Sequence, residues 1–190
     1  MSMDAAASER AHVALERLLA AHEAYFDVEH DYSFAGRDFA GYAELHSSAS
    51  QYVLVKRAKL WETTSHEYLF FKLVSHLDTA TFDELVTFMK EEAIAKVSLG
   101  PDHMNSFLSL VIIADSMDAD LARHVRRTHF RKSFMLGLKG WADLRVCVVC
   151  LDENTVYANA MGADMVPTLE ANTFSSYPPL PLVLIRISSG

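Results

Sequence analysis

The chain has 190 residues, of which 51% are hydrophobic and 22% are charged, and its formal net charge is −8. This composition is typical of a globular domain and excludes a disordered or fibrous chain. Because negative charge repels phosphate backbones and anionic lipids, we expect neither nucleic acid nor a membrane surface as the partner.

The chain also lacks the usual marks of secretion and of membrane insertion. Its only cysteines are Cys147 and Cys150, too few for a disulfide scaffold. Residues 1–10 lack the basic and then apolar pattern of a signal peptide. The longest apolar runs, Phe107–Ala114 and Val146–Leu151, fall short of the roughly 20 residues that span a bilayer. We therefore expect a cytoplasmic protein.

The first half of the chain predicts one helix followed by three strands. Apolar residues at three- and four-residue steps predict a helix over Ser8–Phe26. Asp27–Arg37 is polar and is expected to be a loop or a weak edge strand. Period-two patterns then predict strands in Phe39–His46, Tyr52–Trp61 and Glu67–Val74.

A second helix is predicted over Asp78–Val97. Thr81 and Glu84 have the spacing of a capping box at its start, and Gly100-Pro101 is expected to end it.

The second half predicts a buried strand, a short helix and three further strands. The strand is Asn105–Ala114, which is almost continuously apolar, and the helix is Asp118–Arg127. The later strands are expected in Phe130–Leu138, Ala142–Leu151 and Thr155–Asn159.

These elements predict a single α+β domain over residues 8–165. The sheet is expected to be mixed or mostly antiparallel, with six to eight strands and about three helices in the order α-βββ-α-β-α-βββ. Residues 166–190 are expected to form an extended C-terminal tail, in which Leu182–Ile187 could add a strand. Pro178 and Pro181 form a P-x-x-P in this tail, which suits either a recognition segment or a tail laid on its own domain.

Basic residues concentrate between Arg123 and Arg145, which hold seven of the 17 lysines and arginines. Such side chains can make charge-assisted hydrogen bonds to phosphate or carboxylate groups. The alternative is a solvated face whose cations pair with the 25 carboxylates of the chain. The predicted ligand-binding residues are Arg127, Arg131, Lys132, Lys139, Trp141 and Arg145.

The other polar clusters do not form a recognisable motif. Cys147 and Cys150 lie three apart on a predicted strand and face opposite sides, so we interpret them as core residues rather than a metal or redox pair. Asp102-His103 beside Asp115 could make a carboxylate-oriented histidine, but a surface or helix-end histidine is the preferred interpretation. We therefore predict no catalytic residue, no metal ligand and no cofactor.

The order α-βββ-α-β resembles the common core of the restriction-endonuclease-like nucleases. Those enzymes need an acidic residue on the second strand and E-x-K on the third. The predicted second strand offers Lys56, Arg57 and Lys59 instead. On the third strand, Glu67 is followed by a lysine only at Lys72.

Several segments together carry a resemblance to a known family. They are Phe130–Phe134, Gly137, Lys139–Trp141, Asp143, Arg145, Glu67–Phe70, Val156–Asn159 and Gly162. These segments resemble an uncharacterised family of small bacterial domains of unknown function. The similarity covers about Ala21–Met165 and leaves out the tail from Pro167. The resemblance implies a bacterial cytoplasmic origin and no established activity.

Two functional hypotheses follow. The first is a non-catalytic binding or assembly module, with a homodimer as one form of assembly, that recognises an anionic small molecule or an acidic protein through residues 123–145. The second is a metal-dependent enzyme of restriction-endonuclease-like topology with a displaced or decayed site.

Overall fold

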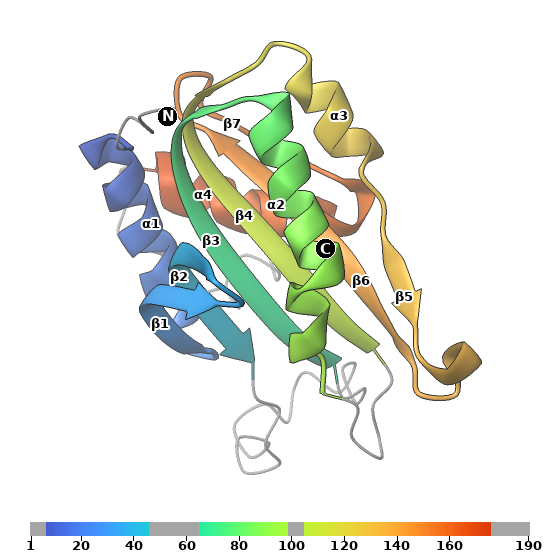
Figure 1. Cartoon of the computed structure of the whole chain (residues 1–190). Helices are drawn as coiled ribbons and strands as arrows, with labels where there is room; N and C mark the ends of the chain where they lie inside the picture. The colour runs from blue at the N-terminus through green and yellow to red at the C-terminus, as the bar shows by residue number, and fades with distance from the viewer. Residues whose placement is uncertain (1–6, 46–64, 99–104, 176–190) are drawn as a thin grey trace.

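The computed structural model describes residues 7–45, 65–98 and 105–175. They form a mixed seven-stranded sheet covered by helices on both faces (Figure 1), which confirms the predicted α+β class and the approximate order of elements. The strands are β1 (Asp27–Phe34), β2 (Arg37–Leu45), β3 (Ser65–Leu77), β4 (Asn105–Met117), β5 (Arg131–Ser133), β6 (Trp141–Cys150) and β7 (Thr155–Ala158).

Within the described ranges there are four α-helices rather than about three, together with short 3₁₀ turns. The helices are α1 (Glu9–His22), α2 (Thr79–Glu91), α3 (Leu121–Arg127) and α4 (Val166–Phe174). The 3₁₀ turns are η2 (Ala93–Lys96), η3 (Met135–Gly137) and η4 (Ala160–Met165).

The sheet is antiparallel at its edges and parallel at its centre. Its strand order is β1-β2-β3-β4-β6-β5, and β7 also pairs with β6. β1, β2 and β3 form an antiparallel meander, whereas β3, β4 and β6 run parallel. β4 is paired on both sides and covered on both faces, which explains why its sequence is a nearly continuous apolar run.

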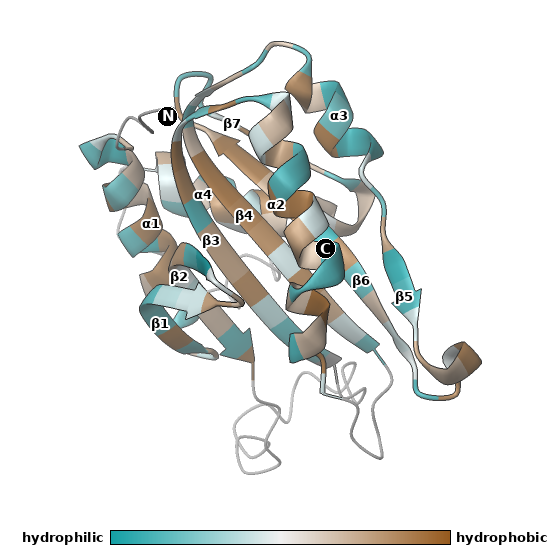
Figure 2. Cartoon of the chain, viewed as in Figure 1, coloured by the Kyte–Doolittle hydropathy of each residue, from teal (hydrophilic) through white to brown (hydrophobic). Residues whose placement is uncertain are grey.

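Each face of the sheet has its own apolar core. On one face α2, η2 and α3 pack on side chains such as Tyr68, Phe70 and Leu110. On the other face α1 and α4 pack on Leu69, Val111 and their neighbours. Figure 2 shows the apolar colour concentrated on the central strands between these layers.

The segment from Asp27 to Phe34 is the edge strand β1. Of the two alternatives left open for this segment, the edge strand is confirmed and the loop is wrong. Ala35 and Gly36 both have positive φ and make the turn into β2. The second strand of the observed sheet is therefore Arg37–Leu45, which carries Asp38 and Glu44. The segment that we compared with the nuclease second strand, Tyr52–Trp61, lies outside the described residues.

Helix α2 begins earlier than the capping box predicts. The Asp78 carboxylate accepts a hydrogen bond from the Thr81 backbone N–H at 2.7 Å, so Asp78, not Thr81, is the N-cap. An aspartate at this position satisfies N–H groups that the first turn leaves unpaired.

Residues 166–174, which we placed in an extended tail, form helix α4 instead. Its Leu169 is buried against the core that α1 covers, and the Arg17 Nε of α1 donates to the Asn172 backbone oxygen at 2.7 Å. Pro167 lies in the first turn, where its missing N–H leaves no helical bond unmade. Gly100-Pro101, Pro178, Pro181 and the predicted strand Leu182–Ile187 lie outside the described residues.

A buried asparagine joins β6 to the segments beside it. β5 pairs with the start of β6 and β7 with its end, which leaves a gap near Val146. Asn159 Nδ2 donates to the oxygens of Leu144 (2.9 Å) and Thr128 (3.1 Å), and its Oδ1 accepts from the N–H groups of Val146 (3.0 Å) and Gly162 (2.9 Å). The side-chain amide thus makes the bonds that a neighbouring strand would make in this gap.

Candidate functional site

The projecting hairpin between β5 and β6 is the most unusual surface feature of the described chain (Figure 1). We call residues 134–140 the hairpin tip. Phe134 N–H donates to the Gly140 oxygen at 2.9 Å, and Lys139 N–H donates to the Phe134 oxygen at 3.2 Å. These bonds close the turn, so the tip is an ordered structure and not a loose loop.

The hairpin tip exposes apolar side chains instead of burying them. Leu136 is completely exposed (102%), and Leu138 (85%) and Met135 (65%) are largely so. Met135 and Leu136 also have φ of 48° and 56°, a left-handed conformation that side chains with a Cβ rarely adopt. A strained backbone that turns apolar groups outwards indicates a contact surface.

Arg131, one of the predicted binding residues, lies at the base of this hairpin. Its Nε and Nη2 donate to the two carboxylate oxygens of the buried Asp143, at 2.6 and 2.8 Å. The guanidinium also stacks on Trp141, 5.5 Å from the ring centroid. The hydrogen bonds to Asp143 raise the pKa of Arg131. This pair fixes the base of the hairpin in a bidentate geometry.

The six predicted binding residues do not share one face. Lys132 pairs with Ala142, on the α2 side of the sheet, and its ammonium lies 6.0 Å from the Phe134 ring. Arg127 is exposed at the end of α3, and Lys139 is half-buried in the hairpin tip. Arg131 and Trp141 face the opposite side with Asp143.

Arg145 faces the α1 and α4 side and is buried in a polar pocket. Its Nη2 lies 3.1 Å from the Asp164 carboxylate, its Nη1 lies 3.6 Å from Glu67, and its guanidinium stacks on Phe107 at 3.5 Å. Two carboxylates therefore already neutralise this arginine. The pocket does not have the free positive charge that binding a small anion requires.

The pocket is small and incompletely hydrogen-bonded. Its free space is about 20 Å³, enough for about one water molecule. Arg145 Nε and the neighbouring buried Ser109 Oγ have no protein partner. His22 also lines the pocket. Burial lowers the pKa of His22, and this effect exceeds the opposing effect of the hydrogen bond between its Nδ1 and the Leu18 oxygen at 2.7 Å. An ordered water is the species that fits these groups.

Cys147 and Cys150 are buried free thiols, which confirms their interpretation as core residues. Burial raises the pKa of Cys147 to about 12, so its reactive thiolate form is suppressed. Among residues 7–45, 65–98 and 105–175, no three His, Cys, Asp or Glu side chains gather to hold a metal ion. His103, which we considered beside Asp115, is outside these ranges, and Asp115 binds the backbone and hydroxyl of Ser8 at the start of α1.

Comparison with protein families gives one match, to a domain of unknown function, DUF8052, over residues 11–171. The chain belongs to the DUF8052 family. This confirms the resemblance to an uncharacterised family, but the DUF8052 match extends to residue 171 and so includes most of α4, which we had placed outside it. No curated protein and no solved structure matches the chain. Within the described part of this DUF8052 protein, no helix is long and apolar enough to cross a membrane.

The exposed leucines of the hairpin tip were not predicted from the sequence. Phe130–Leu138 has the pattern of a strand, in which alternate apolar residues would be buried. The signal that was available is the pair Gly137 and Gly140: both have positive φ and mark the tip. The cations of residues 123–145 are also neighbours only along the chain, because the sheet places Lys132 on the opposite face from Arg131 and Arg145.

Proposed function

We propose that this DUF8052 domain is a protein-binding module that holds an acidic, partly apolar protein surface on its hairpin tip. The observation that carries the proposal is Leu136, an apolar side chain completely exposed on a strained and hydrogen-bonded turn. Scattered exposed apolar residues are common. Three in one projecting turn form a patch of the kind that marks interaction sites.

The charges beside the hairpin tip favour an acidic partner. Lys132 precedes it and Lys139 lies within it, whereas Arg127, at the end of α3, lies at the far end of β5 from the tip (Figure 1). Figure 2 shows hydrophilic β5 leading into the apolar tip. Lysines beside an apolar patch complement carboxylates beside an apolar patch on the partner. Such charge complementarity raises the association rate and fixes the orientation of the two proteins.

A small anionic ligand, the other partner considered from the sequence, is less well supported. The two arginines best placed to bind one, Arg131 and Arg145, are each engaged by carboxylates. A protein partner instead uses the exposed surface of the hairpin, whose leucines need an apolar counterpart.

Peptide selection on the purified full chain tests this proposal. A library of random phage-displayed peptides is enriched on the wild-type protein, and the selected peptides are synthesised for affinity measurement. We expect sequences rich in Asp and Glu around apolar or aromatic residues. Their affinity should fall at least tenfold in the double variant Leu136→Ser, Leu138→Ser and in Lys132→Glu. Matched controls are Val13→Ser, an apolar residue 53% exposed on α1, and Lys90→Glu at the end of α2; both should bind normally.

Several outcomes contradict the proposal. They are a failure to enrich peptides, enrichment without acidic residues, and equal affinity for the tip variant. Leu136-dependent binding to phosphatidylserine vesicles would assign the tip to a membrane instead. Leu136-dependent self-association in sedimentation would assign it to a second copy of this chain, the homodimer considered from the sequence.

We further propose that the protein works in a bacterial cytoplasm. The family resemblance and the two buried free thiols support this location. Immunodetection in fractionated cells of the source organism tests it, and recovery outside the cytoplasmic fraction contradicts it.

A metal-dependent enzyme stays the second candidate because α1, β1, β2, β3, α2 and β4 follow one another in the α-βββ-α-β order. Titration with Mg²⁺ or Mn²⁺ separates the two hypotheses. A rise in melting temperature favours the enzyme, since a ligand that binds the native state stabilises it, and no change favours the binding module.

A further inference from the structure

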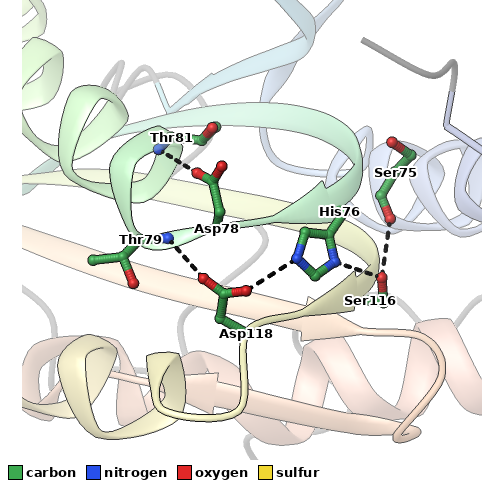
Figure 3. A network of polar contacts seen from close by, with 7 residues as sticks. All are labelled: Ser75, His76, Asp78, Thr79, Thr81, Ser116 and Asp118. Atoms are coloured by element: carbon green, nitrogen blue, oxygen red, sulfur yellow. Dashed lines mark hydrogen bonds and ion pairs between the residues drawn. The ribbon is translucent and has the colours of Figure 1, made fainter. Parts of the chain in front are cut away.

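A serine, a histidine and an aspartate meet where the central strands β3 and β4 end (Figure 3). His76 Nδ1 lies 2.8 Å from Ser116 Oγ, and His76 Nε2 lies 3.1 Å from Asp118 Oδ1. A nucleophile, a base and a carboxylate are thus connected by hydrogen bonds through one imidazole ring. Such a chain of contacts is one geometric requirement for an activated serine.

The parallel pairing of β3 and β4 creates this arrangement. His76 and Ser116 are register partners in adjacent strands, and Asp118 directly follows the end of β4. The three residues therefore lie at the carboxyl ends of parallel strands, the edge where ligands bind in open α/β sheets. Nothing in the linear sequence links residues 40 positions apart, so this cluster is visible only in the fold.

The protonation state follows from the partners of the ring. The carboxylate of Asp118 accepts from Nε2, so in neutral His76 the proton is on Nε2 and Nδ1 carries the lone pair. Ser116 then donates its hydroxyl proton to Nδ1, as a nucleophile donates to its base. When His76 is protonated, Ser116 Oγ can turn to the Ser75 backbone oxygen, 3.5 Å away.

Asp118 is held in place from its other side. Its Oδ2 accepts from the Thr79 backbone N–H of α2 at 3.3 Å. The positive end of this helix therefore lies at the cluster. His76 and Asp118 have side-chain exposures of 51% and 45%, so a substrate can reach the imidazole from solvent.

We propose that Ser116 and His76 form a nucleophilic site for acyl transfer from small neutral or cationic esters. Ser116 Oγ bonds to the acyl carbon while its proton moves to His76 Nδ1. The ester C–O bond then breaks, and His76 returns the proton to the departing alkoxide. Water hydrolyses the acyl-serine by the same route. Asp78 and Asp118 place negative charge beside the ring, which disfavours anionic substrates. Asp118 is a positioning residue that acts through His76.

Labelling with a fluorophosphonate tests the proposal directly. Ser116 Oγ bonds to phosphorus, fluoride leaves, and the serine proton goes to His76. Peptide mass spectrometry of the wild-type full chain should find the label on Ser116. The internal control is Ser33, an exposed serine bonded to the carboxylate of Asp38 but to no histidine. Equal labelling of the two serines, or no label on Ser116, overturns the proposal without any variant.

Variants then separate catalysis from structure. Hydrolysis of p-nitrophenyl acetate should be lost in Ser116→Ala and should fall about 100-fold in His76→Gln, the contribution expected of a general base. Ser33→Ala should match the wild type. Rates of Ser116→Ala or His76→Gln within twofold of the wild type contradict the assignment.

The role of Asp118 needs its own pair of variants. Asp118→Asn keeps an acceptor for Thr79 but lets the amide donate to Nε2, which favours the wrong tautomer. We expect slower labelling of Ser116 at an unchanged melting temperature, with recovery in Asp118→Glu. Unchanged labelling in Asp118→Asn, or no recovery in Asp118→Glu, shows that Asp118 only bonds the Thr79 N–H of α2 and overturns its positioning role.

Discussion

Replacing Asn159 by alanine tests whether its side-chain amide holds the gap between β5 and β7. Asn159 is 1% exposed, and its amide makes four hydrogen bonds to backbone groups. A typical buried hydrogen bond contributes about 1 kcal/mol net to stability. The four bonds therefore predict a loss of about 4 kcal/mol for Asn159→Ala, a large share of the roughly 5–15 kcal/mol that stabilises a domain.

Urea unfolding followed by far-UV circular dichroism measures this free energy. The matched control is Asn154→Gly, because Asn154 is exposed and has φ of 48°, which glycine adopts readily. We expect the control to change stability by less than about 1 kcal/mol. A loss below about 1 kcal/mol in Asn159→Ala refutes the reasoning, since water would then satisfy the freed backbone groups as well as the amide does.

Two further predictions concern buried titratable groups. Burial lowers the pKa of His22 below 6.5 in the folded state. Below that pH the unfolded chain binds the extra proton, so the free energy of unfolding falls as the pH drops. Urea unfolding measured between pH 7 and 5 should show a weaker pH dependence of this free energy for His22→Leu than for the wild type, and an identical slope contradicts the assignment. The thiol of Cys147 is buried, and burial raises its pKa to about 12. Ellman's reagent at pH 8 should therefore modify Cys147 only after the protein unfolds. A rapid reaction of the native protein contradicts this, because it would show that the core around β6 is accessible to the reagent.

The sequence predicted the helices and strands in which the spacing of apolar residues directly determines which side chains are buried. The apolar stripe of α1 at three- and four-residue steps became the buried face of that helix. The continuous apolar run of β4 predicted a buried strand, and the structure confirms it. Cys147 and Cys150 were assigned to the core because residues three apart on a strand face opposite sides and free cysteines are usually buried, and burial of both thiols confirmed this.

Local signals failed where a tertiary contact outweighs them. The polar segment of β1 left a loop and a weak edge strand open, and antiparallel pairing with β2 decides for the strand. Helix α4 has a weak apolar pattern, and packing of Leu169 against the α1 side of the core supports it. The hairpin tip was mistaken for a strand because its leucines suggest burial, whereas the turn projects them outwards.

The sequence alone thus determined the composition class, most helices and strands, and the inward position of the core residues, because these depend on the periodicity of neighbouring side chains. Only the tertiary structure decided which polar groups meet. Strand order and register placed His76 beside Ser116 and put Lys132 and Arg145 on opposite faces. Contacts between distant segments depend on strand pairing, which a single sequence does not encode in any local pattern.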